Sequence, residues 1–205
     1  MTSVLVPAAR FERWVLNFRG RHGETGLTVV DGALAGAADD GSTFTARLPF
    51  AAAYDGLPDA AGFAAGVAAP GDWGLLLVRK GGFAVARLAG EQTVASKVGQ
   101  RHVQGRTKAG GQSQQRFARR RDNQARQAYE AAADHAARLL EGLRGPVVAG
   151  GDRPAVEEVL EDPRLRHLAV LDPWLPVPDP RRAVLEQALV DACSVQVVVT
   201  NADDS

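Results

Sequence analysis

The feature that most limits the possible folds is a pair of glycines between two apolar runs. Residues 73–80 are WGLLLVRK, and residues 82–90 are GFAVARLAG, so that Gly81 and Gly82 lie at the junction. Both runs have the length and composition of strands, and a diglycine supplies the positive φ angles that a tight hairpin turn requires. We therefore expect an antiparallel hairpin, with residues 91–99 as a third antiparallel strand.

The chain beyond this hairpin predicts one loop and then alternating helices and strands. Residues 100–112 are polar and rich in glycine, which predicts a loop, and residues 113–143 have apolar positions at helical spacing, which predicts one long helix. Further strands are expected at 146–151, 167–171 and 195–200, and further helices at 154–160 and 181–192. The predicted fold class is therefore α/β (α+β), with a mixed β-sheet flanked by helices.

The first 70 residues predict a small separate β-rich extension. Short alternating or β-branched runs at 14–19, 27–31 and 42–49 predict antiparallel strands, and the Ala/Gly/Pro-rich segment 51–72 predicts a linker with at most one short helix. We therefore expect an N-terminal extension with its linker over residues 1–70 and a second domain over residues 71–205.

Charge is concentrated in one part of a chain that is neutral overall. The 205 residues include 24 Lys and Arg and 24 Asp and Glu, yet residues 97–126 hold nine basic residues and one acid, Asp122. Such a basic segment is typical of a nucleic-acid contact. The single cysteine, Cys193, excludes an internal disulfide, and no apolar run is long enough to span a membrane. A cytoplasmic protein is expected.

Residues 108–121, KAGGQSQQRFARRR, contain the motif that suggests a function. The tripeptide Gly-Gly-Gln alone could equally be a catalytic motif or a structural glycine loop before a helix. The longer string resembles the class-1 translation termination factor of eukaryotes and archaea, whose pattern is Gly-Gly-Gln-Ser-x-x-Arg-Phe-Ala-Arg-x-Arg. Every fixed position of that pattern is met between Gly110 and Arg121. The chain has no room for the codon-reading domain of that factor, and it more closely resembles the Vms-like release factor family in its actinobacterial form.

This resemblance implies an RNase H-like release-factor central domain and a peptidyl-tRNA hydrolase acting on stalled ribosomes or free large subunits. The catalytic residues would be Gln112, Gly110 and Gly111. The glycines let the backbone approach the ester closely, and Gln112 supplies an amide and a main-chain N–H to position water and the oxyanion. Because an amide does not titrate near neutral pH, Gln112 is not a general base. No metal and no other cofactor is implied.

The basic residues of the segment are the predicted contacts to ribosomal RNA. They are Arg101, Arg106, Lys108, Arg116, Arg119, Arg120, Arg121 and Arg126. A solvated helix face is the alternative for the helical arginines, but their confinement beside a polar loop favours phosphate contacts without base specificity. The expected partners are the large ribosomal subunit and peptidyl-tRNA, with no membrane, and the expected state is a monomer.

Two other functions remain open from the sequence. One is an endonuclease that trims the acceptor end of tRNA, and the other is a non-catalytic ribosome-binding or RNA-binding module in which Gly-Gly-Gln is only a flexible tip. Asp152, Asp162 and Asp172 lie near strand ends, where a nuclease of the RNase H type would hold metal. The first strand of that sheet, residues 73–80, contains no acid. We therefore expect these carboxylates to serve as caps and turn residues.

Overall fold

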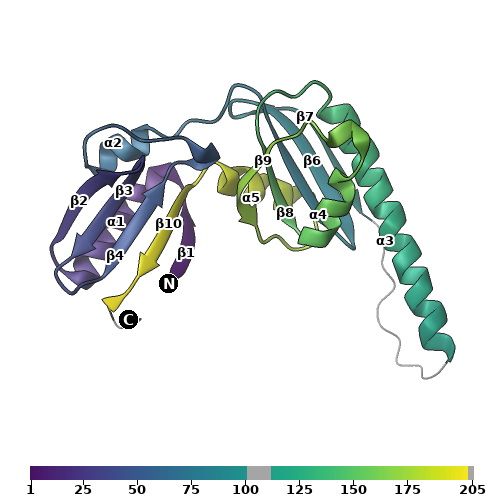
Figure 1. Cartoon of the computed structure of the whole chain (residues 1–205), viewed down its shortest axis with the longest axis horizontal. Helices are drawn as coiled ribbons and strands as arrows, with labels where there is room; N and C mark the ends of the chain where they lie inside the picture. The colour runs from purple at the N-terminus through teal and green to yellow at the C-terminus, as the bar shows by residue number, and fades with distance from the viewer. Residues whose placement is uncertain (101–111, 203–205) are drawn as a thin grey trace. The chain divides into compact units, whose positions relative to one another are not determined.

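The chain forms two compact units, each built around its own sheet (Figure 1). A computed structural model describes residues 1–100 and 112–202, and the side chains of residues 112–125 lie outside that description. The central unit comprises Pro70–Ala188, and the flanking unit combines Met1–Ala69 with Leu189–Ser205. The two ends of the chain therefore belong to the same unit.

The central unit contains a mixed five-stranded sheet with the order β7-β6-β5-β8-β9. The strands are β5 (Trp73–Arg79), β6 (Gly82–Ala89), β7 (Gln92–Gln100), β8 (Val147–Gly151) and β9 (Val170–Leu175). β5, β6 and β7 are antiparallel neighbours, whereas β8 is parallel to β5 and β9 is parallel to β8. The predicted hairpin, the third strand and the mixed sheet are confirmed. The positive φ angles expected of the diglycine are wrong, because neither Gly81 nor Gly82 has one and Gly82 is already the first residue of β6.

Helices α3 (Gln112–Leu139) and α4 (Arg153–Leu160) cover one face of this sheet. Leu76 and Val78 of β5 belong to the core formed with these two helices. The short 3-10 helix η2 (Pro163–Leu165) also contributes to this core. A strand buried on both faces has a nearly continuous apolar sequence, as LLLV does here.

The first residues of α5 (Arg182–Ala192), which belong to the central unit, lie against the opposite face of its sheet. Leu75 of β5 is fully buried, and the strand register places Ala86 and Ser96 on the same face as Leu75. Arg182, the first residue of α5, donates from Nη1 to Ser96 Oγ at 3.3 Å. The sheet is therefore flanked by helices on both faces, as the sequence predicts.

The flanking unit is an antiparallel sheet with the order β1-β10-β4-β3-β2. Its strands are β1 (Thr2–Val6), β2 (Thr25–Val30), β3 (Ala33–Ala38), β4 (Thr43–Arg47) and β10 (Val195–Thr200). The other elements are α1 (Ala8–His22), the 3-10 helix η1 (Pro49–Ala51) and α2 (Ala60–Ala65). The antiparallel character expected of residues 1–70 is confirmed.

The strand predicted at residues 14–19 is wrong, because these residues lie within α1. The buried positions of α1 are Phe11, Val15 and Phe18, a spacing of four and then three residues that is helical. The helix begins after Pro7 and ends at His22, and the following Gly23 has a positive φ of 93° that favours glycine. A short window starting at Trp14 omits Phe11 and hides this periodicity.

The strand at residues 195–200 forms as predicted but not in the predicted sheet. β10 pairs with β1 on one side and β4 on the other, and both partners belong to the flanking unit. Val195 and Val197 are fully buried in the core of that unit. The predicted domain over residues 71–205 therefore does not include its last strand. β10 instead completes the sheet formed by the N-terminal residues.

The helices have two further properties that bear on the predictions. α3 begins one residue earlier and ends four residues earlier than the predicted 113–143, so Gln112 is helical rather than part of the loop. Within residues 1–100 and 112–202, no helix is long and apolar enough to cross a membrane.

Replacing Gly145 with alanine should destabilise the central unit. A Cβ atom at Gly145 would overlap the backbone carbonyl oxygen of Asp72, which cannot rotate away. Overpacking against fixed backbone costs about 3 kcal/mol. Urea unfolding followed at Trp73, which is buried in the central unit, should show this loss.

Gly71 provides the matched control for Gly145, because a Cβ there would meet nothing within 4 Å. Gly71→Ala should change the free energy of unfolding by less than about 0.5 kcal/mol. Equal stability of the Gly145→Ala and Gly71→Ala proteins would contradict the close approach of residue 145 to Asp72.

Candidate functional site

The Gly-Gly-Gln motif lies between the third strand and the long helix of the central unit. β7 ends at Gln100, and Gln112 is the first residue of α3. The first four N–H groups of a helix have no partner within the helix. Gln112 therefore lies where its main-chain N–H is not used by the helix itself.

Several predicted site residues fall outside the described residues. They are Arg101, Arg106, Lys108, Gly110 and Gly111. Four others lie on α3 with side chains outside the description: Arg116, Arg119, Arg120 and Arg121. Arg126 is described and is exposed. The structure thus brings Gln112 and these helical arginines onto one element, and their roles stay predictions.

The first half of α3 extends past the strands of the central sheet (Figure 1). Ala128 is the first residue of α3 that the structure shows buried, sixteen residues after Gln112. At about 1.5 Å per residue, this separation is about 24 Å along the helix axis. We call residues 112–127 the arm.

The second half of α3 is held firmly on the sheet. Ala132 and Ala136 are fully buried in the core, where their small side chains let the helix lie close to the strands. Arg87 of β6 donates from Nη1 to the carbonyl oxygen of Glu141 at 2.7 Å, just beyond the end of α3. It also donates to both carboxylate oxygens of Asp72, at 2.9 and 3.0 Å. These hydrogen bonds lower the pKa of Asp72 and link the helix end to the start of the unit.

A small hollow lies at the base of the arm, where the chain leaves β7. Its volume is about 270 Å³, and its lining residues are Gly82, Phe83, Gly99, Gln100, Gln127, Ala128 and Ala131. A Cβ at Gly99 would overlap the ring of Phe83, so only glycine lets the ring lie flat over β7. This close approach fixes Phe83 between the last residues of β7 and the base of the arm.

His135 lies next to Phe83 and is kept neutral by its surroundings. The two rings stack with centroids 5.4 Å apart. Burial lowers the pKa of His135, and the nearby charges of Arg138 and Lys97 lower it further. Arg138 Nη2 lies 2.9 Å from His135 Nδ1, and because arginine can only donate, the imidazole proton is on Nε2. His135 is thus a support of α3 and not a charged contact at neutral pH.

Two of the three carboxylates named from the sequence, Asp152 and Asp162, lie close to arginines. The prediction of Asp172 as a cap or turn residue is wrong, because it lies within β9. Arg79, at the end of β5, lies 3.4 Å from Asp152 and 3.7 Å from Asp179. Arg164 lies 2.7 Å from Asp162 and lowers the pKa of that carboxyl to about 2. Within the described part of the chain, no group of three possible ligands that could hold a metal ion occurs. At the ends of β5 and β8, where a metal nuclease would hold its metal with several acids, the positive charge of Arg79 lies beside Asp152 instead.

Some features of the site were not predicted from the sequence. Phe83, Gly99, Lys97 and His135 come together only because β6, β7 and α3 are neighbours. Tyr129 of α3 is buried in the core of the central unit. The regular spacing of Ala128, Ala132 and Ala136 was the signal for that packed face.

Comparison with known proteins agrees with this arrangement. Residues 71–198 match a family model described as the Actinobacteria/chloroflexi VLRF1 release factor. The match starts before β5, includes the Gly-Gly-Gln segment and α3, and ends within β10. No curated protein matches the chain. Because the match covers more than half of the residues, the chain belongs to the Actinobacteria/Chloroflexi VLRF1 release factor family, which acts in ribosome-associated release.

Proposed function

We propose that this protein is a peptidyl-tRNA hydrolase that frees nascent chains on stalled ribosomes or free large subunits. The observation that supports this most is the position of Gln112, the first residue of α3, whose first half extends past the strands of the central sheet (Figure 1). A long, narrow arm suits a substrate ester that lies deep within RNA. The protein would act in the cytoplasm as a monomer, without a metal or nucleotide cofactor.

The chemistry that we propose is positioning rather than proton transfer by a side chain. Hydrolysis of the ester between peptide and tRNA needs a water aligned with the carbonyl carbon and a donor for the developing oxyanion. In the proposed site the amide of Gln112 orders the water, and its main-chain N–H, which the helix leaves unpaired, donates to the oxyanion. Gly110 and Gly111 would let this backbone approach the ester without steric overlap.

The arginines of the arm are proposed to hold ribosomal RNA through its phosphates. Reversing two of these charges in the variant Arg119→Glu/Arg120→Glu should weaken binding to large subunits. The variant makes fewer phosphate contacts, so its binding releases fewer counterions from the RNA. The plot of log K against log salt should become shallower by about 2. Filter binding across a salt series measures both effects.

Two arginines away from the arm make a matched control. Arg166 and Arg181 are exposed on the central unit, and Arg166→Glu/Arg181→Glu makes the same charge change. This control should bind nearly as the wild type does. If both double variants lose affinity equally, net charge and not the arm determines binding.

The state of the released tRNA distinguishes hydrolysis from endonuclease action. A hydrolase leaves the 3′ end of the tRNA intact, so sequencing the released tRNA should recover complete acceptor ends. Acceptor ends shortened by one or more nucleotides would support the endonuclease instead. The pairing of Arg79 with Asp152 and Asp179 argues against a metal nuclease at the strand ends.

A further inference from the structure

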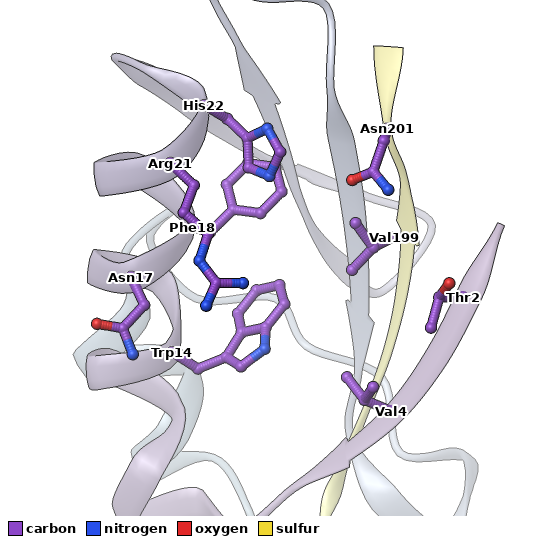
Figure 2. A pocket seen from close by; sticks show the side chains of 9 residues that line it. All are labelled: Thr2, Val4, Trp14, Asn17, Phe18, Arg21, His22, Val199 and Asn201. Atoms are coloured by element: carbon purple, nitrogen blue, oxygen red, sulfur yellow. The ribbon is translucent and has the colours of Figure 1, made fainter. Parts of the chain in front are cut away.

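The flanking unit contains a hollow that no part of the proposed hydrolysis uses. Its volume is about 310 Å³, near the lower limit for ligand pockets in proteins. The lining residues are Thr2, Val4, Trp14, Asn17, Phe18, Arg21, His22, Val199 and Asn201. Figure 2 shows the side chains of Trp14, Phe18 and Arg21 on the side of α1 that faces β1 and β10. We call this site the α1 hollow.

Trp14 is fixed in place by other aromatic rings. Its indole stacks on Phe11 at 6.2 Å between centroids and on Phe18 at 5.7 Å, and it packs edge-on against Phe44 at 5.1 Å. Phe11, Phe18 and Phe44 are buried, whereas Trp14 is only partly buried. The α1 hollow therefore has a rigid, partly exposed indole in its wall, held without the need for a ligand.

The indole N–H of Trp14 is available for a ligand. Trp174 donates its indole N–H to the carbonyl oxygen of Gly151 at 3.2 Å, and Trp73 donates to that of Gly90 at 2.8 Å. Among the residues that the structure describes, the indole N–H of Trp14 has no such acceptor. A donor that is left open on a partly exposed indole suits a ligand with hydrogen-bond acceptors on its edge.

The charged groups of the α1 hollow favour an anionic ligand. The lining includes Arg21 and His22 and no Asp or Glu, and neither β1 nor β10 contains a charged residue. His22 donates from Nδ1 to Asp40 at 2.8 Å, and the pKa of Asp40 is lowered first by the hydrogen bond from the backbone N–H of Ser42 and then by this bond from His22. Arg21 is exposed and makes no ion pair within the described residues, so its guanidinium is free for a phosphate.

We propose that the α1 hollow binds one unpaired nucleotide of single-stranded RNA. The base would lie against Trp14 and the apolar side chains of Val4 and Val199, its edge would accept a hydrogen bond from the indole N–H, and Arg21 would meet the phosphate. A peptide is a poorer fit, because an acidic peptide would use Arg21 but not the apolar wall of Val4, Val199 and Trp14. This inference concerns binding alone and does not depend on hydrolysis at Gln112.

The indole N–H resonances provide a direct test in the full-length protein. The chain has three tryptophans, and with ¹⁵N-labelled tryptophan the signal of Trp14 can be assigned from the variant Trp14→Phe. Titration with hexauridylate and hexaadenylate should shift the Trp14 signal and leave those of Trp73 and Trp174 in place. Binding of RNA to the arginines of the arm alone would not move Trp14.

Two matched variants make the test specific to the α1 hollow. Arg21→Gln removes the proposed phosphate contact and should raise the Kd read from the Trp14 shift by about tenfold. Arg13→Gln makes the same charge change at an exposed position of α1 that does not line the hollow, and should leave that Kd unchanged. The proposal is overturned if RNA leaves the Trp14 signal unmoved, if both variants weaken the shift equally, or if hexaglutamate produces the same shift as RNA.

Discussion

Gln112→Ala is expected to reduce the rate of peptide release from large subunits by about 100- to 1,000-fold, the usual cost of removing one positioned donor from a hydrolytic site. Binding to the subunits should be unchanged, because the arginines that we assign to docking are intact. The backbone N–H of residue 112 also remains in the variant, which leaves part of the oxyanion stabilisation. Single-turnover release under saturating protein measures the rate separately from the affinity.

The same helix offers matched controls for this variant. Gln114 and Gln115 lie within the first turn after Gln112, so Gln114→Ala and Gln115→Ala make the same chemical change close by. Both should release peptide at nearly the wild-type rate. Unchanged release by Gln112→Ala would remove the proposed mechanism and favour a protein that binds ribosomes without catalysing hydrolysis.

A chain that ends at Cys193 is expected to lose the fold of its flanking unit while its central unit stays folded. β10 lies between β1 and β4, so its removal leaves β1 without a neighbour and exposes an edge of β4. Burial of Val195 and Val197 each contributes about 1.5–3 kcal/mol. With the loss of two strand pairings, the total approaches the whole stability of a small domain, about 5–15 kcal/mol.

Hydrogen exchange distinguishes the two units in this truncated chain. The amides of β3 and β4 should lose protection, and those of β5 and β6 should keep it. A chain that ends at Ala202 retains all of β10 and the hydrogen bond from Ala202 N–H to Ser42 Oγ, and it should exchange as the full chain does. Retained protection in β3 and β4 after loss of β10 would contradict the pairing of the two chain ends.

Local signals in the sequence were sufficient for the hairpin and the long helix of the central unit, whereas β9 begins three residues later than the strand predicted at 167–171. The diglycine at residues 81 and 82 and the apolar run before it predicted the β5–β6 hairpin, and the alanine spacing predicted α3. These elements pair with neighbours in sequence, where turn chemistry and periodicity determine the outcome. The partner of β10 could not be predicted in this way, because the β-branched run VQVVVT specifies a strand but not which sheet it joins.

The two candidate sites also differ in whether their residues are close together in the sequence. The Gly-Gly-Gln segment and the arginines after it are contiguous, so the amino-acid sequence alone reveals the motif. The α1 hollow combines residues from β1 and α1 with residues from β10, which lies nearly 200 positions after β1. Because the pattern of residues 14–19 predicts a strand, it does not place Trp14 and Arg21 on one surface. The helical conformation of α1 places these two residues on one face, and packing on the sheet adds the residues of β1 and β10.

Peptide release measured on two forms of the same substrate tests the central claim most directly. The wild-type protein is mixed either with large subunits that hold labelled peptidyl-tRNA or with free peptidyl-tRNA in solution. Because Gln112 only positions groups in a site that the ribosome completes, we predict rapid release from the subunits and almost none from the free substrate. No release from the subunits above the rate without protein, or equal release from both substrates, would contradict the account.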